Sequence, residues 1–357
     1  MNQRQQISSD EAFVDELYTT LLKRPADPAG RAFYVARLEQ GISRIDLTRE
    51  IATSGEFFEL LCRQAFGPQT GDPFLAYASP GHFQSPLPSR EDVDALALTG
   101  TSFDPATCPD IDLAVDAQLA WLKTLGPLTA DLAFAQDPPG QTRYYSENDS
   151  FSLGDATLLA ALMRHLRPAR IVEAGAGFST AVMLDVSERF LGNSVRIDSI
   201  EPDPARLRSL LRGDERLSLH QARVQDADIG LFEQLGANDI LFIDSSHVLK
   251  LGSDVAFLLF RVLPRLHPGV FVHIHDIAWP FEYPVEWYRL GRAWNEAYAV
   301  RAFLAFNGRF RMVLFADYLV RAHREAVRAQ MPLALRQRRG VPEYGNSACS
   351  LWLRVED

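Results

Sequence analysis

Residues 171–180 read IVEAGAGFST, and this stretch decides the fold. A short apolar segment runs into a turn that contains Gly175 and Gly177, and a helix pattern begins at once. Glycine lets the backbone approach a ligand closely, and the free N–H groups at a helix amino terminus bind polar groups. The stretch therefore predicts a strand, a ligand-binding turn and a helix of an α/β protein.

Two classes of nucleotide ligand use such a turn. A dinucleotide-binding site requires a third glycine for close helix packing, and this sequence has Thr180 at that position. Glu173, at the strand end, disfavours a bound pyrophosphate but suits a cationic ligand. S-adenosylmethionine carries a sulfonium and an ammonium and no phosphate, so the pattern favours it. An ordinary glycine turn without a ligand remains the alternative.

Apolar segments alternate with helix patterns from about residue 150, which predicts a mostly parallel, doubly wound sheet with helices on both faces. The expected strands are 171–172, 195–200, 240–243 and 270–274. The expected helices are 154–166, 178–190, 203–212, 228–235, 252–264 and 290–306. Segments 310–315 and 349–355 are expected to close the sheet as an antiparallel pair, which gives an antiparallel final strand.

Acidic residues stand at the carboxyl ends of successive strands, where open α/β sheets bind ligands. Glu201 is placed to accept the ribose hydroxyls of a nucleoside, and Gln225 and Asp226 to contact the adenine edge. Asp244 ends the next strand. The predicted cofactor-binding residues are Glu173, Gly175, Gly177, Ser179, Thr180, Glu201, Gln225, Asp226 and Asp244.

With these residues, segment 140–320 resembles a class I S-adenosylmethionine-dependent methyltransferase. The resemblance also includes the runs 244–247 (DSSH) and 273–276 (HIHD). A narrower resemblance is to a bacterial group associated with surface-polysaccharide and glycan synthesis, carried by the runs GHF at 81–83, PFEYP at 280–284 and WNE at 294–296. It implies methyl transfer to a hydroxyl of a sugar or glycan precursor.

A second group of residues stands at neighbouring strand ends: Asp244, His247, His273, His275 and Asp276. In catechol-type and antibiotic-sugar O-methyltransferases, carboxylates at such places hold a divalent metal ion that lowers the pKa of the acceptor hydroxyl. The resemblance implies Asp244, His275 and Asp276 as ligands here, although His275 departs from the oxygen ligands of those enzymes. Alternatively, His247 or His275 is a general base without metal. Asp244, His247 and His275 are thus the predicted catalytic residues, and the role of His273 stays open.

Two aromatic segments flank these residues. The run 144–149 (YYSEND) is placed either to cover the cofactor or to line the acceptor pocket. Trp279, Phe281, Tyr283 and Trp287 follow the last His-Asp pair, where they either stack on a sugar or pack locally. The sequence leaves both choices open.

The amino-terminal part has a different pattern. Residues 1–65 predict an all-α accessory domain of four helices, and the runs LKRPADPAG at 22–30 and SGEF at 54–57 resemble a small helical domain found on bacterial cell-surface and glycan-related proteins. That resemblance implies protein docking. Residues 66–135 predict a Pro/Gly-rich, turn-rich connector with a helix over 111–135, packed on the catalytic domain, and residues 136–357 form the methyltransferase domain.

Composition excludes several classes of protein. With 46 acidic and 36 basic residues and a net charge of −10, the chain is a poor general binder of nucleic acid or anionic lipid. No apolar run approaches the roughly 20 residues of a membrane span, and residues 1–18 lack the apolar core of a signal peptide. Three distant cysteines exclude a disulfide scaffold. We therefore expect a cytoplasmic protein without a transmembrane segment or a nucleic-acid partner.

Two other functions remain open from the sequence. One is a nicotinamide-dependent oxidoreductase on the same fold, disfavoured by the missing third glycine and by Glu173. The other is a non-catalytic interaction protein with an inert α/β domain, disfavoured by the intact acids of the cofactor site.

Overall fold

The computed structural model describes residues 9–57, 60, 82, 84–99, 104–138, 140–213, 215–339 and 348–357. The chain divides into two compact units, residues 1–96 and 97–357, and each is described by itself. Across the described residues, no helix combines the length and apolarity that a membrane span requires.

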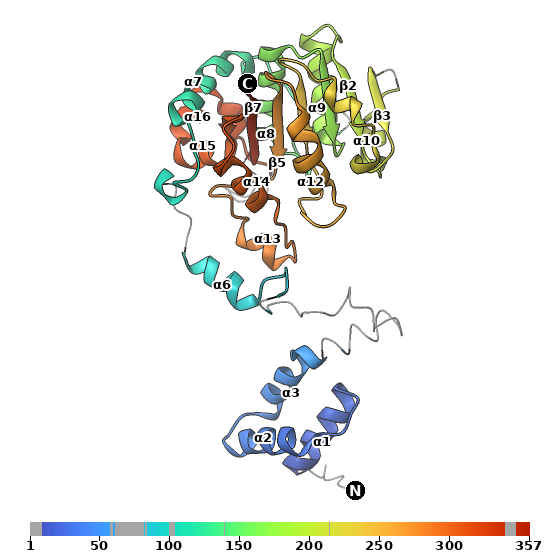
Figure 1. The fold of residues 1–357 in the computed structure, drawn as a ribbon, viewed down its shortest axis with the longest axis vertical. Coiled ribbons are helices and arrows are strands. Elements are labelled where there is room, and N and C mark those ends of the chain that lie inside the picture. Colours follow the sequence, from blue (N-terminus) through green and yellow to red (C-terminus); the bar gives the residue numbers. More distant parts are fainter. Residues whose placement is uncertain are drawn as a thin grey trace. The chain divides into compact units, whose positions relative to one another are not determined.

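Besides most of helix α6 (Arg90–Thr99), the first unit contains three described helices, α1 (Asp10–Leu21), α2 (Pro28–Glu39) and α3 (Arg44–Ala52) (Figure 1). Each begins at a side chain that accepts a backbone N–H, from Ser9, Asp27 and Ser43 respectively, which satisfies an otherwise free donor. The apolar faces meet in a small core around Val14 and Leu47. The helical prediction for this region holds for these elements, while most of the expected fourth helix lies outside the described residues.

The second unit is built on one seven-stranded sheet with the order β3-β2-β1-β4-β5-β7-β6 (Figure 1). The strands are β1 (Arg170–Ala174), β2 (Arg196–Ile200), β3 (Leu217–His220), β4 (Ile240–Ile243), β5 (Phe271–His275), β6 (Phe310–Phe315) and β7 (Ser350–Val355). Strands β1 to β5 pair in parallel, and β7 is antiparallel to both β5 and β6. The predicted doubly wound, mostly parallel sheet with an antiparallel final strand is confirmed.

Helices cover both faces of this sheet, and each face has its own apolar core. One core includes residues of α7 (Val115–Leu125), α8 (Leu153–Leu166), α9 (Phe178–Phe190), α15 (Ala316–Ala322) and α16 (Arg324–Gln330). The other includes α11 (Gly230–Glu233), α12 (Asp254–Phe257) with the turns η4 (Leu258–Val262) and η5 (Leu263–Arg265), and α14 (Glu296–Ala305). Burial on both sides explains why β4 reads as a continuous apolar run, and why β1 and β5 are mostly apolar and are interrupted only by Arg170, Glu173 and the two histidines.

Remaining short elements connect these layers. They are η1 (Pro105–Thr107), η2 (Gly126–Thr129), α10 (Ala205–Leu210), η3 (Val224–Asp226), α13 (Val285–Arg289) and η6 (Pro332–Leu335). The sequence prediction differs from the structure at several places, and helices α13, α15 and α16 were not among the expected ones. Strand β3 was not expected. The helix expected over 111–135 is limited to α7, because the 3₁₀ turn at Gly126 ends it. The predicted connector contains helix α6 (Arg90–Thr99). Of the connector's aromatic residues, Phe74, Tyr77 and Phe83 lie outside the described residues.

Candidate active site

The glycine turn after β1 is in direct contact with the end of β4. Gly175 has a φ of +84°, and a Cβ atom added there would lie 1.8 Å from the carbonyl oxygen of Asp244. No side chain fits that gap, so glycine is required. Gly177 differs, because its φ of 174° is extended and the nearest atom to an added Cβ, Cδ of Arg206, is 3.4 Å away. Gly177 precedes α9, whose first N–H groups therefore stay accessible to a ligand.

Glu173 lies beneath this turn, fully buried. Its carboxylate accepts hydrogen bonds from the hydroxyls of Ser179 (2.6 Å), Thr180 (2.6 Å) and Ser199 (2.5 Å). Burial raises the pKa of Glu173 to about 7, although the three hydroxyl groups act in the opposite direction. The structure thus brings Glu173, Ser179 and Thr180 together as a support of the turn, with their polar atoms directed at one another.

Glu201 is held against the same turn from the end of β2. One carboxylate oxygen accepts the N–H of Ala176 at 3.1 Å, and the other accepts the N–H of Asp203 at 2.8 Å. A carboxylate has spare acceptor sites after two such bonds, so it can still accept hydroxyl groups of a ligand. The ends of β1, β2 and β4 therefore meet at one place.

Gln225 and Asp226 lie on η3, beyond the end of β3. The side-chain amide of Gln225 donates to the carbonyl of Gly252 at 3.0 Å, and exposed Asp226 pairs with Arg223 at 2.7 Å. In the described part of the chain, neither side chain forms a hydrogen bond or ion pair with the glycine turn, so their predicted contact with an adenine ring stays a prediction.

A compact charged cluster lies at the ends of β4 and β5. Nε2 of His247 is 3.6 Å from a carboxylate oxygen of Asp244 and 3.6 Å from one of Asp276. Nδ1 of His247 is 2.8 Å from a carboxylate oxygen of Glu296, which is buried. The side chains of Asp244 and Asp276 are 31% and 20% exposed, whereas that of His247 is 6% exposed. The two aspartates therefore face the solvent, with the imidazole behind them.

The charges of this cluster stabilise one another. Burial tends to raise the pKa of Asp244, but His275 and His247 outweigh it and lower that pKa to about 2. Burial acts to lower the pKa of His247, and Asp244 and Glu296 raise it well above its ordinary value. Asp244 is therefore an anion and His247 a cation at neutral pH.

The loop that carries His247 is fixed to the start of α14. The carbonyl of His247 accepts the backbone N–H groups of Asn295 and Glu296, at 3.1 and 3.2 Å. The side-chain oxygen of Asn295 accepts the N–H of Leu249 at 2.6 Å. The sequence did not identify Glu296 as a site residue, because a glutamate in the first turn of a helix is an ordinary feature.

The two histidines of β5 have different surroundings. His273 is fully buried, stacks on Phe242 with ring centroids 3.8 Å apart, and burial moves its pKa well below the ordinary value. His275 lies next to Asp276, with Nε2 3.6 Å from the carboxylate. His273 is therefore a neutral core residue, while His275 belongs to the cluster.

The predicted metal ligands do not fit a metal site. Among the residues that the structure describes, no group of three His, Cys, Asp or Glu side chains is arranged to hold a metal ion. Nε2 of His247, a cation at neutral pH, lies 3.6 Å from a carboxylate oxygen of each aspartate, so it already supplies the positive charge that a metal ion would bring. We derive no step through a metal.

The aromatic residues beyond β5 divide into two groups. Trp279, Phe281 and Tyr283 are at most 2% exposed and pack in the core, so local packing is the correct interpretation for them. Trp287 and Trp294 are partly exposed, and the ring of Trp294 lies 4.3 Å from that of His247, centroid to centroid.

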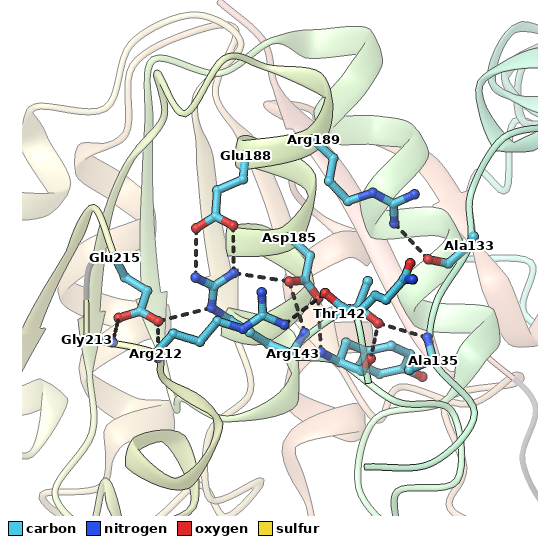
Figure 2. Close-up of polar contacts among 12 residues, drawn as sticks. Ala133, Ala135, Thr142, Arg143, Asp185, Glu188, Arg189, Arg212, Gly213 and Glu215 are labelled. Atoms are coloured by element: carbon cyan, nitrogen blue, oxygen red, sulfur yellow. Dashed lines mark hydrogen bonds and ion pairs between the residues drawn. The ribbon is translucent and has the colours of Figure 1, made fainter. Parts of the chain in front are cut away.

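Segment 133–147 is joined to α9 by a buried network (Figure 2). Arg143, with a side chain 2% exposed, pairs with Asp185 (3.2 Å), Glu188 (2.8 Å) and Glu215 (3.1 Å). Tyr144 next to it is fully buried, and its hydroxyl donates to the carbonyl of Phe151. Arg143 and Tyr144 are thus packed in the core, and the place of run 144–149 over the cofactor or in the acceptor pocket stays a prediction. A pocket of about 330 Å³ beside the network is lined by Ala133, Phe134, Ala135, Gln141, Thr142 and Arg189.

Two family models match parts of the chain. Residues 172–277 match the family model of a methyltransferase domain, and residues 2–61 match that of a domain of unknown function (DUF4214). A protein of Archaeoglobus fulgidus described as uncharacterized is 33% identical over 168 residues, which are 45% of this chain and 75% of that protein. The chain belongs to the same family as this archaeal protein, and it contains a methyltransferase domain.

Two solved structures are similar at lower identity. The O-methyltransferase TomG of Streptomyces achromogenes, in complex with S-adenosylmethionine, is 14% identical with a TM-score of 0.38, over 67% of this chain and 90% of that one. The methyltransferase PaMTH1 of Podospora anserina, bound to S-adenosylhomocysteine, is 14% identical with a TM-score of 0.36, over 77% of this chain and all of that one. No function is transferred from these likenesses.

Proposed function

We propose that this chain is an S-adenosylmethionine-dependent methyltransferase that methylates a hydroxyl group of a sugar or glycan precursor. The observation that carries the proposal is the meeting of three strand ends at the glycine turn. The turn contacts Asp244 through Gly175 and Glu201 through the N–H of Ala176. This is the crevice in which doubly wound sheets bind nucleosides.

The described residues fit the donor. S-adenosylmethionine supplies a methyl group on a positively charged sulfur. Glu201 can accept the ribose hydroxyls, and the free N–H groups at the start of α9 can bind the polar part of the ligand. Asp244 stays ionised at neutral pH and places a negative charge beside the turn, which favours a cationic ligand.

The charged cluster provides a place for the acceptor hydroxyl. In the transfer, the acceptor oxygen forms a bond to the methyl carbon, the carbon–sulfur bond breaks, and the hydroxyl proton leaves. Asp244 and Asp276 present their carboxylates to the solvent side. Asp276, whose pKa burial raises, is the group that can accept that proton, because Asp244 with a pKa of about 2 is too weak a base. Glu296 holds His247 through Nδ1, and His247 in turn holds the two aspartates through Nε2.

The choice of a glycan acceptor rests on the sequence resemblance of segments 280–284 and 294–296. A role of the helical unit in docking and a cytoplasmic location are parts of the same proposal.

Calorimetric titration of the full chain with S-adenosylmethionine, S-adenosylhomocysteine and NADH tests the donor. We expect both methionine-derived nucleosides to bind and NADH not to bind. Incubation with isotope-labelled donor and a panel of sugar nucleotides, followed by mass spectrometry, then tests the acceptor. Binding of NADH without either nucleoside would refute the proposal.

A further inference from the structure

An exposed arginine lies on two tryptophans beside the charged cluster. The guanidinium carbon of Arg292 is 5.4 Å from the ring centroid of Trp287 and 5.1 Å from that of Trp294. The two indole rings are themselves in edge contact, with centroids 5.1 Å apart. The backbone N–H of Arg292 donates to the carbonyl of Trp287 at 2.9 Å, which fixes the turn.

Arg292 has no ionic partner within the described part of the chain. Its guanidinium lies on the two indole rings instead, although acidic residues outnumber basic ones and the chain has a net charge of −10. A guanidinium that stacks on an aromatic face keeps its N–H groups free in the plane of the group. Those N–H groups match the paired oxygens of a carboxylate or a phosphate.

The position of Arg292 relates it to the methyl acceptor. Trp294, on which it stacks, contacts His247, and the next residues, Asn295 and Glu296, bind the His247 loop. The donor residues Gly175 and Glu201 lie at β1 and β2, whereas this segment follows β5. A chain of contacts therefore links Arg292 to Asp276: Arg292 stacks on Trp294, Trp294 contacts His247, and Nε2 of His247 is 3.6 Å from Asp276.

We propose that Arg292, supported by Trp287 and Trp294, binds an anionic group of the acceptor, so that the substrate is an acidic glycan precursor. The anion is a phosphate of an activated sugar or a carboxylate of the sugar itself, since both have the same paired oxygens. This inference rests on the proposed methyltransferase function.

The test measures acceptor-side binding with the donor site filled. The full chain, saturated with S-adenosylhomocysteine, is titrated with UDP-glucose, with glucuronic acid and with neutral methyl glucoside, and binding is followed by ligand-observed NMR. We expect UDP-glucose or glucuronic acid to bind, and the neutral sugar to bind more weakly. The anion that binds identifies whether phosphate or carboxylate is recognised.

Three variants separate the local effect from the change in net charge. R292Q should weaken binding of the anionic probe at least about tenfold, because a charge-assisted contact is lost. R292K should retain part of the affinity, since it keeps the charge but not the planar group. R216Q removes one exposed positive charge just before the edge strand β3 and should leave binding of the anionic probe unchanged.

The two proposals fail in different ways. If the wild-type chain does not bind S-adenosylhomocysteine, the proposed function is refuted. If the wild-type chain binds that nucleoside but neither anionic probe, the inference about Arg292 is wrong while the function stands. The same holds if the R292Q variant binds the anionic probe as tightly as the wild-type chain does.

Discussion

Replacing Gly175 with alanine tests whether the approach of the turn to β4 holds the site together. The new Cβ would meet the carbonyl oxygen of Asp244 at 1.8 Å, and a backbone atom cannot rotate away. The φ of +84° costs a residue with a side chain about 1–2 kcal/mol, and the forced shift of packed backbone about 1–3 kcal/mol more. We expect a loss of about 2–5 kcal/mol in the free energy of unfolding, with weaker binding of S-adenosylmethionine.

Urea denaturation followed by tryptophan fluorescence measures this loss. All five tryptophans lie in the unit of residues 97–357, so the signal reports on that unit. Gly192→Ala is the matched control, because Gly192 also has a positive φ, +63°, but no atom lies within 4 Å of an added Cβ. It should lose only the conformational part, about 1–2 kcal/mol. Equal losses in the two variants would show that contact with Asp244 is not what requires glycine.

Three further predictions concern the site. Glu201→Ala should weaken S-adenosylmethionine binding by about 1–3 kcal/mol in calorimetry, because charge-assisted hydrogen bonds are lost. The control variant Asp203→Ala should bind as the wild type does. Equal affinity of the two folded variants would remove Glu201 from the site. The pKa of Glu173 is raised to about 7 from the ordinary 4.5, so between these pH values the folded chain holds a proton that the unfolded chain releases. The free energy of unfolding should therefore fall by on the order of 3 kcal/mol as the pH rises from about 4.5 to 7. Glu173→Gln should flatten this fall in urea midpoints measured at pH 5 and pH 8; an unchanged slope would contradict the assignment. Turnover should persist after treatment with EDTA, since among the described residues no group of three side chains is arranged to hold a metal ion and the His247 cation already neutralises Asp244 and Asp276. A loss restored by Mg²⁺ would reinstate the metal predicted from the sequence.

The sequence predicts the centre of the sheet well, because the strands buried on both faces read as apolar runs. The residues at their carboxyl ends follow from chain order, and this is why Glu201 and Asp244 were placed at one edge. Strand β3 was missed because Leu-Ser-Leu-His is short and only partly buried at the sheet edge.

Contacts between distant segments could not be predicted in the same way. Glu296 reaches His247 only because the start of α14 binds the loop after β4. His273 and His275 alternate along β5 and their rings stack with centroids 5.5 Å apart, but only packing shows that His273 stacks on Phe242 while His275 lies next to Asp276. Likewise, nothing in the run of aromatics distinguishes buried Trp279 from partly exposed Trp294.

The place of β7 between β5 and β6 has a consequence for synthesis on the ribosome. β5 is synthesised before its neighbour in the sheet, β7, which follows only after residues 276–349. At about 5–20 residues per second, the hydrogen-bonding edge of β5 stays unpaired for roughly 4–15 s. During that time the nascent chain presents an apolar strand edge that invites pairing with other chains. Slower elongation late in the message, or a premature stop before residue 350, should therefore cause aggregation well before any loss of the cofactor crevice itself.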